Sequence, residues 1–382
     1  MTPPAPRFEV AFSADFLNES GQTAFPDIGL SVLKDQPGIS YRFLEEYRVA
    51  YTTDQISAVD VLISLKPRIT EESLQGVERL TAIGRCGVGY DNVDLAACTA
   101  RDIAVFITPA GVVRPVAESI VLFVLATSHR LVAKDRMIRA GAWVESTREL
   151  GREPRGRVVG TIGLGNIARE AVRLLRNFDV GRFMGFDPWV DRETATNLGV
   201  EMVGLEELMR FSDYVLVNCP LTPQTRGMIG ERELGWMKPD AVLINTARGA
   251  IVQEGPLIEA LASRRIGGAA LDVFEREPLD RESPLGAQAA EAAGTANAES
   301  APVGLNESAQ RGKTRVNSAP LKVAFGERSF GNPKRSGGAA RRHRKSMDGR
   351  AKSGQTGNDD ISTGTHRTCT ARKNWLPPTQ LT

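Results

Sequence analysis

Hydrophobic and polar positions divide the chain into two regions of alternating strands and helices and a third region with neither pattern. In the first hundred residues, short runs rich in β-branched and aromatic residues are separated by polar stretches, which is typical of strands. We expect strands at Phe8–Phe12, Val59–Ile63, Leu80–Arg85 and Ile103–Ile107, and a short helix over Leu95–Ala100. This alternation indicates a small parallel α/β domain, with a helix-and-loop excursion between its first two strands.

A long apolar helix follows this domain and is expected to link it to the second region. Its apolar positions recur at helical spacing from about Pro115 to Leu131. Helical segments at 205–210 and 254–263 then lie between further strands. We predict five of these strands, Val158–Ile162, Arg182–Phe186, Tyr214–Asn218, Ala241–Asn245 and Ala269–Val273. The pattern predicts a doubly wound parallel sheet, which binds ligands at the carboxyl ends of its strands.

The first strand of the second region leads into a G-x-G-x-x-A turn. Gly163 allows the sharp turn from strand to helix, Gly165 lets the backbone approach a pyrophosphate, and Ala168 lets the helix pack closely. Asp187 ends the next strand, where its carboxylate can accept hydrogen bonds from a ribose and repel a 2′-phosphate. Glycine-rich turns also occur without a ligand, but this whole succession predicts a dinucleotide site that favours NAD over NADP.

The third region, residues 287–382, differs in composition from the rest of the chain. It holds sixteen Lys and Arg against seven Asp and Glu, although the whole chain has a net charge of only +2. Only twelve of its 96 residues are Val, Ile, Leu, Met, Phe, Trp or Tyr, so we expect it to be disordered. Its basic stretch, Lys334–Lys352, lacks interleaved aromatic residues, which favours a solvated tail over a nucleic-acid-binding arm.

The cysteines and the N-terminus indicate a reducing compartment. Cys86, Cys98, Cys219 and Cys369 form no C-x-x-C pair, so neither a metal site nor a disulfide framework is predicted. Cys219 is expected to be a small buried residue. No apolar leader precedes the first strand, and no stretch approaches the roughly 18 apolar residues that span a bilayer. We therefore expect a soluble, cytoplasmic protein without a membrane partner.

Several separated motifs resemble one family, the D-isomer-specific 2-hydroxyacid dehydrogenases, which include phosphoglycerate dehydrogenases and glyoxylate/hydroxypyruvate reductases. The motifs occur in the family's order and spacing across about residues 55–285. They are Gly84–Asp94, Val116–Glu118, Gly163–Ile167, Pro220–Gly227, Ile244–Gly249 and Ala270–Pro278.

The resemblance implies a Rossmann-type domain inserted into a smaller, flavodoxin-like α/β substrate domain. We assign residues 1–108 to the substrate domain, 109–286 to the NAD-binding domain with its linking helix, and 287–382 to the tail. The resemblance also implies NAD as cofactor, a small 2-oxo or 2-hydroxy acid as substrate, and a homodimer.

The family pattern assigns roles to individual residues. Arg248 would bind the carboxylate and keto oxygen of the substrate, and Glu277 would hold a catalytic histidine and favour its protonated form. Val88 and Gly89 belong to a loop whose backbone amides would bind the substrate carboxylate. The cofactor would contact Gly163, Gly165, Asn166 and Ile167 at the pyrophosphate, Asp187 at the adenosine ribose, Thr246 and Ala247 along the cleft, and Asp272 near the nicotinamide amide.

Three of these residues have ordinary structural alternatives. Asp187 could start only an Asp-Pro turn, Asp272 could be a satisfied carboxylate at a strand end, and Arg248 could form a structural ion pair.

The sequence departs from the family at the catalytic histidine, which the family places about twenty residues after the Glu-Pro pair. Residues 289–302 contain no histidine and no apolar strand. His129 lies on the long helix, and His343 and His366 follow no strand. General acid catalysis contributes roughly 10²–10⁴-fold, so we predict severe loss of activity with cofactor binding retained. The alternative is a catalytically silent NAD(H)-binding regulatory module. A shifted reading frame would explain the tail.

Overall fold

The computed structural model describes residues 8–34, 36–143, 150–280 and 282–285. The predicted disorder of the tail, its basic stretch, His343 and His366 lie outside the described residues. The predicted insertion of the second domain into the first concerns residues after 285, which also lie outside the described residues.

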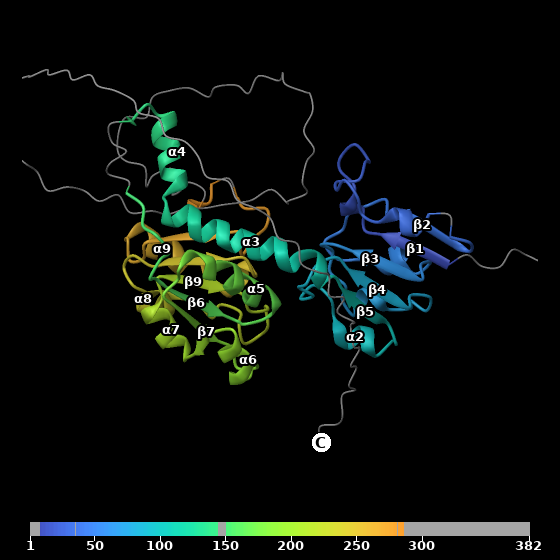
Figure 1. The fold of residues 1–382 in the computed structure, drawn as a ribbon. Coiled ribbons are helices and arrows are strands. Elements are labelled where there is room, and N and C mark those ends of the chain that lie inside the picture. Colours follow the sequence, from blue (N-terminus) through green and yellow to red (C-terminus); the bar gives the residue numbers. More distant parts are fainter. Residues whose placement is uncertain (1–7, 35, 144–149, 281, 286–382) are drawn as a thin grey trace, which may run out of the picture. The chain divides into compact units, whose positions relative to one another are not determined.

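The first region forms a five-stranded parallel sheet in the order β2-β1-β3-β4-β5 (Figure 1). Its strands are β1 (Phe8–Phe12), β2 (Ile39–Phe43), β3 (Val61–Ser64), β4 (Ala82–Arg85) and β5 (Ala104–Ile107). This is the flavodoxin-like order, which confirms the predicted fold class. The sequence analysis missed β2, although Ile39, Tyr41 and Phe43 alternate with Ser40 and Arg42, because it assigned this segment to the helix-and-loop excursion.

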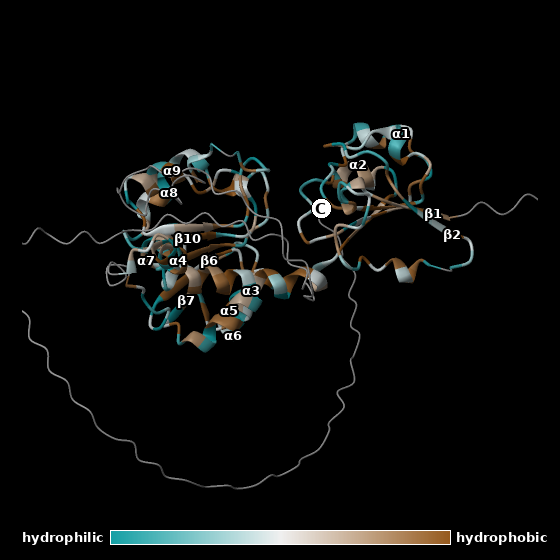
Figure 2. Ribbon diagram, turned by 90° about the horizontal axis from the view of Figure 1, so that it is seen from above, coloured by the Kyte–Doolittle hydropathy of each residue, from teal (hydrophilic) through white to brown (hydrophobic). Residues whose placement is uncertain are grey.

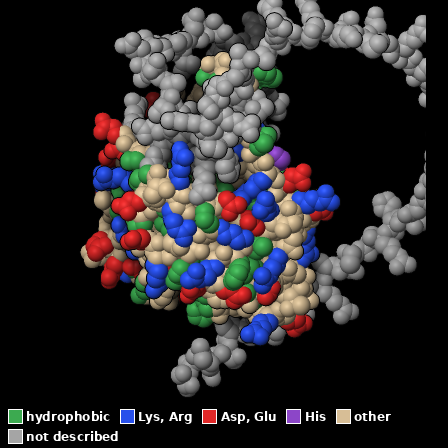
Figure 3. All heavy atoms as spheres, turned by 90° about the vertical axis from the view of Figure 1, so that its left-hand side faces the viewer, with side chains coloured by type: hydrophobic (Ala, Val, Ile, Leu, Met, Phe, Trp, Pro, Cys, Tyr) green, Lys and Arg blue, Asp and Glu red, His purple; other side chains and the backbone are tan. Residues whose placement is uncertain are grey.

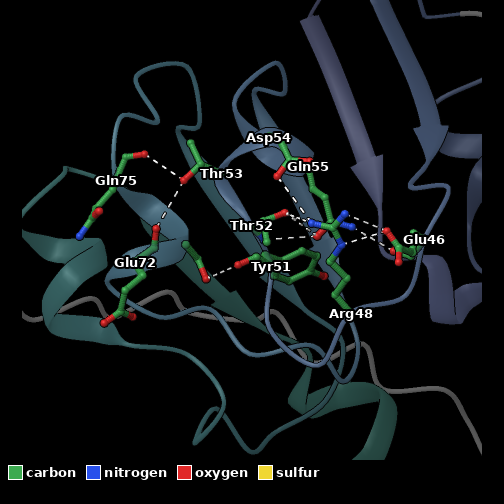
Figure 4. Close-up of polar contacts among 10 residues, drawn as sticks. Glu46, Arg48, Tyr51, Thr52, Thr53, Asp54, Gln55, Glu72 and Gln75 are labelled. Atoms are coloured by element: carbon green, nitrogen blue, oxygen red, sulfur yellow. Dashed lines mark hydrogen bonds and ion pairs between the residues drawn. The ribbon is translucent and has the colours of Figure 1, made fainter.

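The helices beside this sheet are short. They are α1 (Thr53–Ile56), α2 (Leu95–Thr99) and the 3₁₀ turns Ala14–Phe16, Leu30–Val32 and Glu72–Leu74. The hydroxyl of Thr53 donates hydrogen bonds to the carbonyls of Glu72 and Gln75, at 3.4 and 3.1 Å, and Arg48 Nη1 donates to Thr52 Oγ1 at 2.6 Å (Figure 4). These bonds fix α1, whose Ile56 is completely buried in the core of this sheet.

The second region forms a six-stranded parallel sheet in the order β11-β10-β9-β6-β7-β8. Its strands are β6 (Val158–Ile162), β7 (Arg182–Phe186), β8 (Val200–Met202), β9 (Tyr214–Val217), β10 (Val242–Asn245) and β11 (Gly268–Leu271). This is the strand order of dinucleotide-binding folds. Strands β7 and β8 follow β6 on one side, and β9, β10 and β11 lie on its other side, so the order of the strands reverses between β6 and β9. We predicted five strands. The sixth, β8, is a three-residue edge strand with only Val200 buried.

Helices cover both faces of this sheet, as a doubly wound fold requires. They are α3 (Pro109–Ser128), α5 (Asn166–Leu175), α6 (Arg192–Asn197), α7 (Leu205–Phe211), α8 (Glu231–Trp236) and α9 (Glu254–Ala262), with 3₁₀ turns at Arg176–Phe178 and Gly249–Ile251. Val159, Leu216 and Ile244 point into one apolar cluster with α3 and α5. Val215 and Leu243 point into another with α7, α8 and α9. The strands are drawn as hydrophobic in Figure 2.

The long helix α3 begins earlier than its sequence pattern predicted. It starts at Pro109, so Pro115 lies inside it, and it ends at Ser128. A proline at the first helical position needs no hydrogen-bond partner, and Pro109 occupies that position. The region around Leu131 instead begins a separate helix, α4 (Leu131–Arg139), after Arg130 takes a positive φ of 53°.

Helix α3 qualifies the expectation that no stretch approaches bilayer length. Among the described residues it is the one helix long and apolar enough to cross a membrane, with a mean hydropathy of 1.7. Core helices of globular domains meet the same criterion. Here Ile120, Phe123 and Val124 are fully buried against the second sheet, whereas Leu122 is 42% exposed and 33% of the apolar window is buried.

On the face drawn in Figure 3, Lys and Arg side chains are interspersed with Asp and Glu side chains. Neither charge forms a continuous patch among the coloured residues there. This face therefore presents no strong field of one sign.

Candidate functional site

The two glycines of the turn between β6 and α5 differ in backbone conformation and in the space beside them. Gly163 has a φ of +90°, and a Cβ atom there would lie 2.8 Å from the backbone nitrogen of Cys219 and 2.9 Å from the backbone of Asn218. Gly163 is therefore required by the fold. Gly165 has a φ of −74°, and no atom of the described residues lies within 4 Å of the position its Cβ would take. The protein itself has no packing requirement for a glycine there, whereas an approaching phosphate would have one.

Asp187 links this turn to the end of β7. Its carboxylate accepts hydrogen bonds from the backbone N–H of Leu164 at 2.8 Å and of Trp189 at 2.9 Å. The bond to Trp189 shows the Asp-Pro turn that was the alternative reading of this residue. The bond to Leu164 adds a second role, since it ties the side chain to the glycine turn. Each carboxylate oxygen has a further lone pair for a ribose hydroxyl.

Open space lies beside the start of α5. A pocket of about 460 Å³ is lined by the start of α3, by residues along α5 that include the carboxylate of Glu170 as well as Arg173, and by Leu198. Its lining residues include Pro109, Val113, Asn166 and Arg169. Arg169 Nε donates to the Leu164 carbonyl at 2.8 Å, which holds a cation close to the helix start. Free N–H groups at a helix start and a nearby guanidinium suit an anionic ligand.

The loop after β10 is held by a buried asparagine. The Asn245 side chain accepts from the Ala247 N–H and donates to the Arg248 carbonyl, both at 3.0 Å. The Asn245 carbonyl accepts from the Asp272 N–H at 3.0 Å, so this residue joins the loops after β10 and β11. A Cβ atom on Gly249 would overlap the backbone of Phe274 and Glu275. The two loops that carry Thr246, Ala247, Arg248 and Asp272 are thus packed together.

Glu277 lies on the second of these loops and is exposed. Its Oε1 accepts a hydrogen bond from the Phe274 N–H at 3.1 Å. Among the described residues no ion pair joins Glu277 to Arg248. The structure thus places the predicted dyad carboxylate near the end of β11 and orients it by its own loop.

Arg248 contacts the first region of the chain. Its Nε donates to Asp91 Oδ1 at 2.8 Å, and a Cβ atom on Gly89 would overlap its guanidinium. Val88 is half-buried in the same loop. The structure therefore brings Arg248 to the predicted amide loop. It also shows the ion pair that was the alternative for this residue.

Two residues in this neighbourhood were missed by the sequence reasoning. Asp91 holds Arg248, and the half-buried guanidinium of Arg85 has its pKa lowered, mainly by burial and then by the charge of Arg248. Both lie inside the Gly84–Asp94 motif, but nothing in a sequence shows that residues 157 positions apart form a pair.

Cys219 and His129 have the structural roles expected of them. Cys219 is buried, and burial raises the pKa of its thiol to about 11. His129 is exposed and ends α3, where its backbone N–H donates to the Leu125 carbonyl at 2.9 Å.

Comparison with known proteins identifies the family. The sequence profile described as "D-isomer specific 2-hydroxyacid dehydrogenase, NAD binding domain" matches residues 121–294. Glyoxylate reductase of Thermococcus gammatolerans is 35% identical over 68% of this chain and 80% of its own length. The chain therefore belongs to the D-isomer-specific 2-hydroxyacid dehydrogenase family and carries its NAD-binding domain. This confirms the predicted family and cofactor.

The chain is also similar to longer relatives and to solved structures. D-3-phosphoglycerate dehydrogenase of Archaeoglobus fulgidus is 35% identical over 59% of this chain, but the match covers only 42% of its length. The chain thus spans about half or less of the length of the phosphoglycerate dehydrogenases named among its relatives. The structure of D-lactate dehydrogenase from Aquifex aeolicus with NAD and lactic acid is similar at a TM-score of 0.61 and 27% identity, covering 70% of this chain and 78% of that one.

Proposed function

We propose that this chain descends from an NAD-dependent dehydrogenase that transfers a hydride between NADH and a small 2-oxo acid, and that its own turnover is severely impaired. The carrying observation is the position of Arg248. It follows a strand of the dinucleotide-binding sheet, and its guanidinium lies against the Gly87–Gly89 loop. A planar, permanently charged fork of donors suits a 2-oxo carboxylate.

The chain's own groups would bind and orient the substrate. Arg248 would donate to the substrate carboxylate and to the keto oxygen, where negative charge develops during reduction. Backbone amides near Val88 and Gly89 would hold the other side of the carboxylate. NADH, when bound, supplies the hydride. The exposed Gly165 and the pocket beside α5 have room for its pyrophosphate.

The weak step is proton delivery to the keto oxygen. Glu277 would orient a histidine, but His129 is the one histidine among the described residues and it ends α3 at the surface. Without a positioned acid, water must supply the proton, and about 10²–10⁴-fold in rate is lost.

The second candidate is a catalytically silent NAD(H)-binding module. Asp187 and the glycine turn support it, because they would hold the cofactor and take no part in hydride or proton transfer. NADH oxidation with glyoxylate, hydroxypyruvate and 3-phosphohydroxypyruvate, measured beside NADH binding, separates the candidates. Slow turnover that saturates with one 2-oxo acid supports the impaired dehydrogenase, and binding without any turnover supports the silent module. Turnover at ordinary dehydrogenase rates contradicts both.

We also propose that the site prefers NAD over NADP. The half-buried Asp187 carboxylate beside the glycine turn would repel a 2′-phosphate. Asp187→Ala should lower the ratio of the NADPH and NADH dissociation constants. An unchanged ratio would remove the support for this preference.

A homodimer is proposed from the surface of α4. This helix has no buried residue, and Leu131 and Ile138 are 55% and 59% exposed. Because these two residues are seven positions apart, they lie on one face of α4, where a partner subunit would cover them. We expect Ile138→Lys to shift the sedimentation coefficient from dimer to monomer. A wild-type chain that sediments as a monomer at all concentrations would refute the dimer.

The domain boundaries at 108/109 and 286/287, the cytoplasmic location and the origin of the tail remain proposals. The described Cys86, Cys98 and Cys219 are free thiols, which suits a reducing compartment. The nucleotide sequence around codons 284–290 tests the shifted frame. An alternative frame that encodes an apolar strand ending in Pro-His supports it, and the lack of one refutes it.

A further inference from the structure

The guanidinium of Arg248 is held on two sides by protein groups. Its Nε donates to Asp91 Oδ1 at 2.8 Å, and its Nη1 donates to the Ala247 carbonyl, also at 2.8 Å. The third nitrogen, Nη2, is the guanidinium atom nearest to the position that a Cβ on Gly89 would take. Nη2 therefore faces the loop whose amides were assigned to the substrate carboxylate.

A simple ion pair does not explain this arrangement well. The Arg248 and Asp91 side chains are 32% and 30% exposed, and pairs at such positions contribute little to stability. The Asp91 carboxylate does, however, accept a hydrogen bond from Nε, so it holds the guanidinium by its Nε edge. Because the guanidinium is planar and rigid, fixing Nε and Nη1 also fixes the direction of the Nη2 donors.

We propose that Asp91 is a positioning residue, which holds Arg248 by its Nε edge so that Nη2 and the Gly87–Gly89 amides bind the substrate carboxylate together. This proposal rests on the proposed function of Arg248. It assigns Asp91 a role through Arg248 and no direct contact with the substrate.

The charge of Asp91 makes the proposal easy to test. Asp91 lies near two guanidinium groups, since Arg85 is influenced by both Arg248 and Asp91. Removing its negative charge leaves more positive charge beside the substrate, which by itself would strengthen the binding of an anion. A positioning role predicts the opposite result. The sign of the change in affinity therefore separates orientation from charge.

The probe is oxalate, which has about the size of a small 2-oxo acid, carries one more negative charge, and cannot be reduced by NADH. Its dissociation constant would be measured by calorimetry on the full chain with saturating NADH. We expect Asp91→Ala to weaken oxalate about tenfold, because a mobile guanidinium loses the oriented, charged hydrogen bond. Asp91→Asn retains an acceptor for Nε and should change the affinity less than threefold. NADH affinity should not change in either variant.

Two further variants complete the experiment. Asp240→Ala removes another Arg–Asp pair, which Asp240 forms with Arg152 at 2.8 Å. This pair lies before the starts of β9 and β10, at the opposite end of the strands from Arg248, so the substitution should leave oxalate binding unchanged. Gly89→Ala should weaken oxalate as Asp91→Ala does, because its Cβ displaces the guanidinium. Unchanged or tighter oxalate binding in Asp91→Ala would overturn the proposal, as would equal losses in the Ala and Asn variants of Asp91.

A second measurement tests the hydrogen bond between Arg248 and Asp91 in the absence of any ligand. Hydrogen exchange of the Arg248 Nε–H, followed by NMR, should be slow in the wild-type chain and fast in Asp91→Ala. If oxalate fails to bind the wild type, the proposed substrate site fails. Slow exchange would then still show that Asp91 holds Arg248, and fast exchange would refute the positioning role itself.

Discussion

Alanine substitutions at Gly163 and Gly165 should separate the requirement of the fold from the requirement of the cofactor. At Gly163 an alanine would have to adopt a φ near +90° and would place its Cβ within 2.9 Å of the backbone of Asn218. The left-handed backbone costs about 1–2 kcal/mol, and crowding in a packed site adds roughly 1–3 kcal/mol. We expect Gly163→Ala to lower the free energy of unfolding by about 2–5 kcal/mol.

At Gly165 the same substitution meets open space at an ordinary φ of −74°. The unfolded chain loses some freedom and the helix loses a better N-cap residue, and these effects nearly cancel. The free energy of unfolding should therefore change by less than about 1 kcal/mol. The affinity for NADH should fall about tenfold or more, because the added methyl group occupies the space where the backbone approaches the pyrophosphate.

Urea unfolding followed by circular dichroism, together with NADH fluorescence titration, measures both effects. Since unfolding slopes in urea are about 1–3 kcal/mol per molar, the midpoint of Gly163→Ala should fall by roughly 1–2 M. The reasoning is refuted if Gly163→Ala unfolds at the wild-type midpoint, or if Gly165→Ala binds NADH as tightly as the wild type.

Two other predictions concern the loop after β10 and the buried thiol of Cys219. Gly249→Ala should lower the urea midpoint, because its Cβ would overlap the Phe274 backbone. Gly255→Ala in α9 meets no described atom within 4 Å and should stabilise the chain by up to about 1 kcal/mol. Equal midpoints in the two variants would contradict this prediction. The pKa of Cys219 is raised from 9.0 to about 11, so between these pH values the unfolded chain releases a proton that the folded chain keeps. Cys219 should lower the free energy of unfolding across that window by up to about 1.4 kcal/mol per pH unit. Cys219→Ala should therefore show a smaller fall than the wild type, and the raised pKa values of Cys86, Cys98 and Tyr51 account for the rest. An identical pH profile in the variant would refute the assignment.

The strands of the second sheet could be predicted from the sequence because both of their faces are buried. β6 and β7 have the predicted bounds, since each is a continuous run that packs against helices on both sides. The edge strand β8 left little hydrophobic signal, because only Val200 of its three residues is buried, whereas β2 alternates apolar and polar residues and could have been found. Pro109 and Pro115 could each stand at a helix start, and in the structure the helix begins at Pro109.

The candidate site was predictable where one local segment carries it. The turn from Gly163 to Ala168 and the strand end at Asp187 lie within one strand-helix-strand unit, so their spacing is readable. The contact between Arg248 and Asp91 was not readable, because it joins segments of two different sheets. The same is true of Gly249, whose need for glycine comes from the Phe274 backbone.

A single-turnover experiment tests most directly whether the NAD site survives while its proton delivery is lost. The chain, saturated with NADH, would be mixed with glyoxylate, and the loss of NADH absorbance would be followed in a stopped-flow instrument. We predict full NADH occupancy and a decay at least about a hundredfold slower than that of the related glyoxylate reductase from Thermococcus gammatolerans under the same conditions. A decay as fast as that of the relative would show that the chain completes the reaction without the family histidine, and would contradict the proposal.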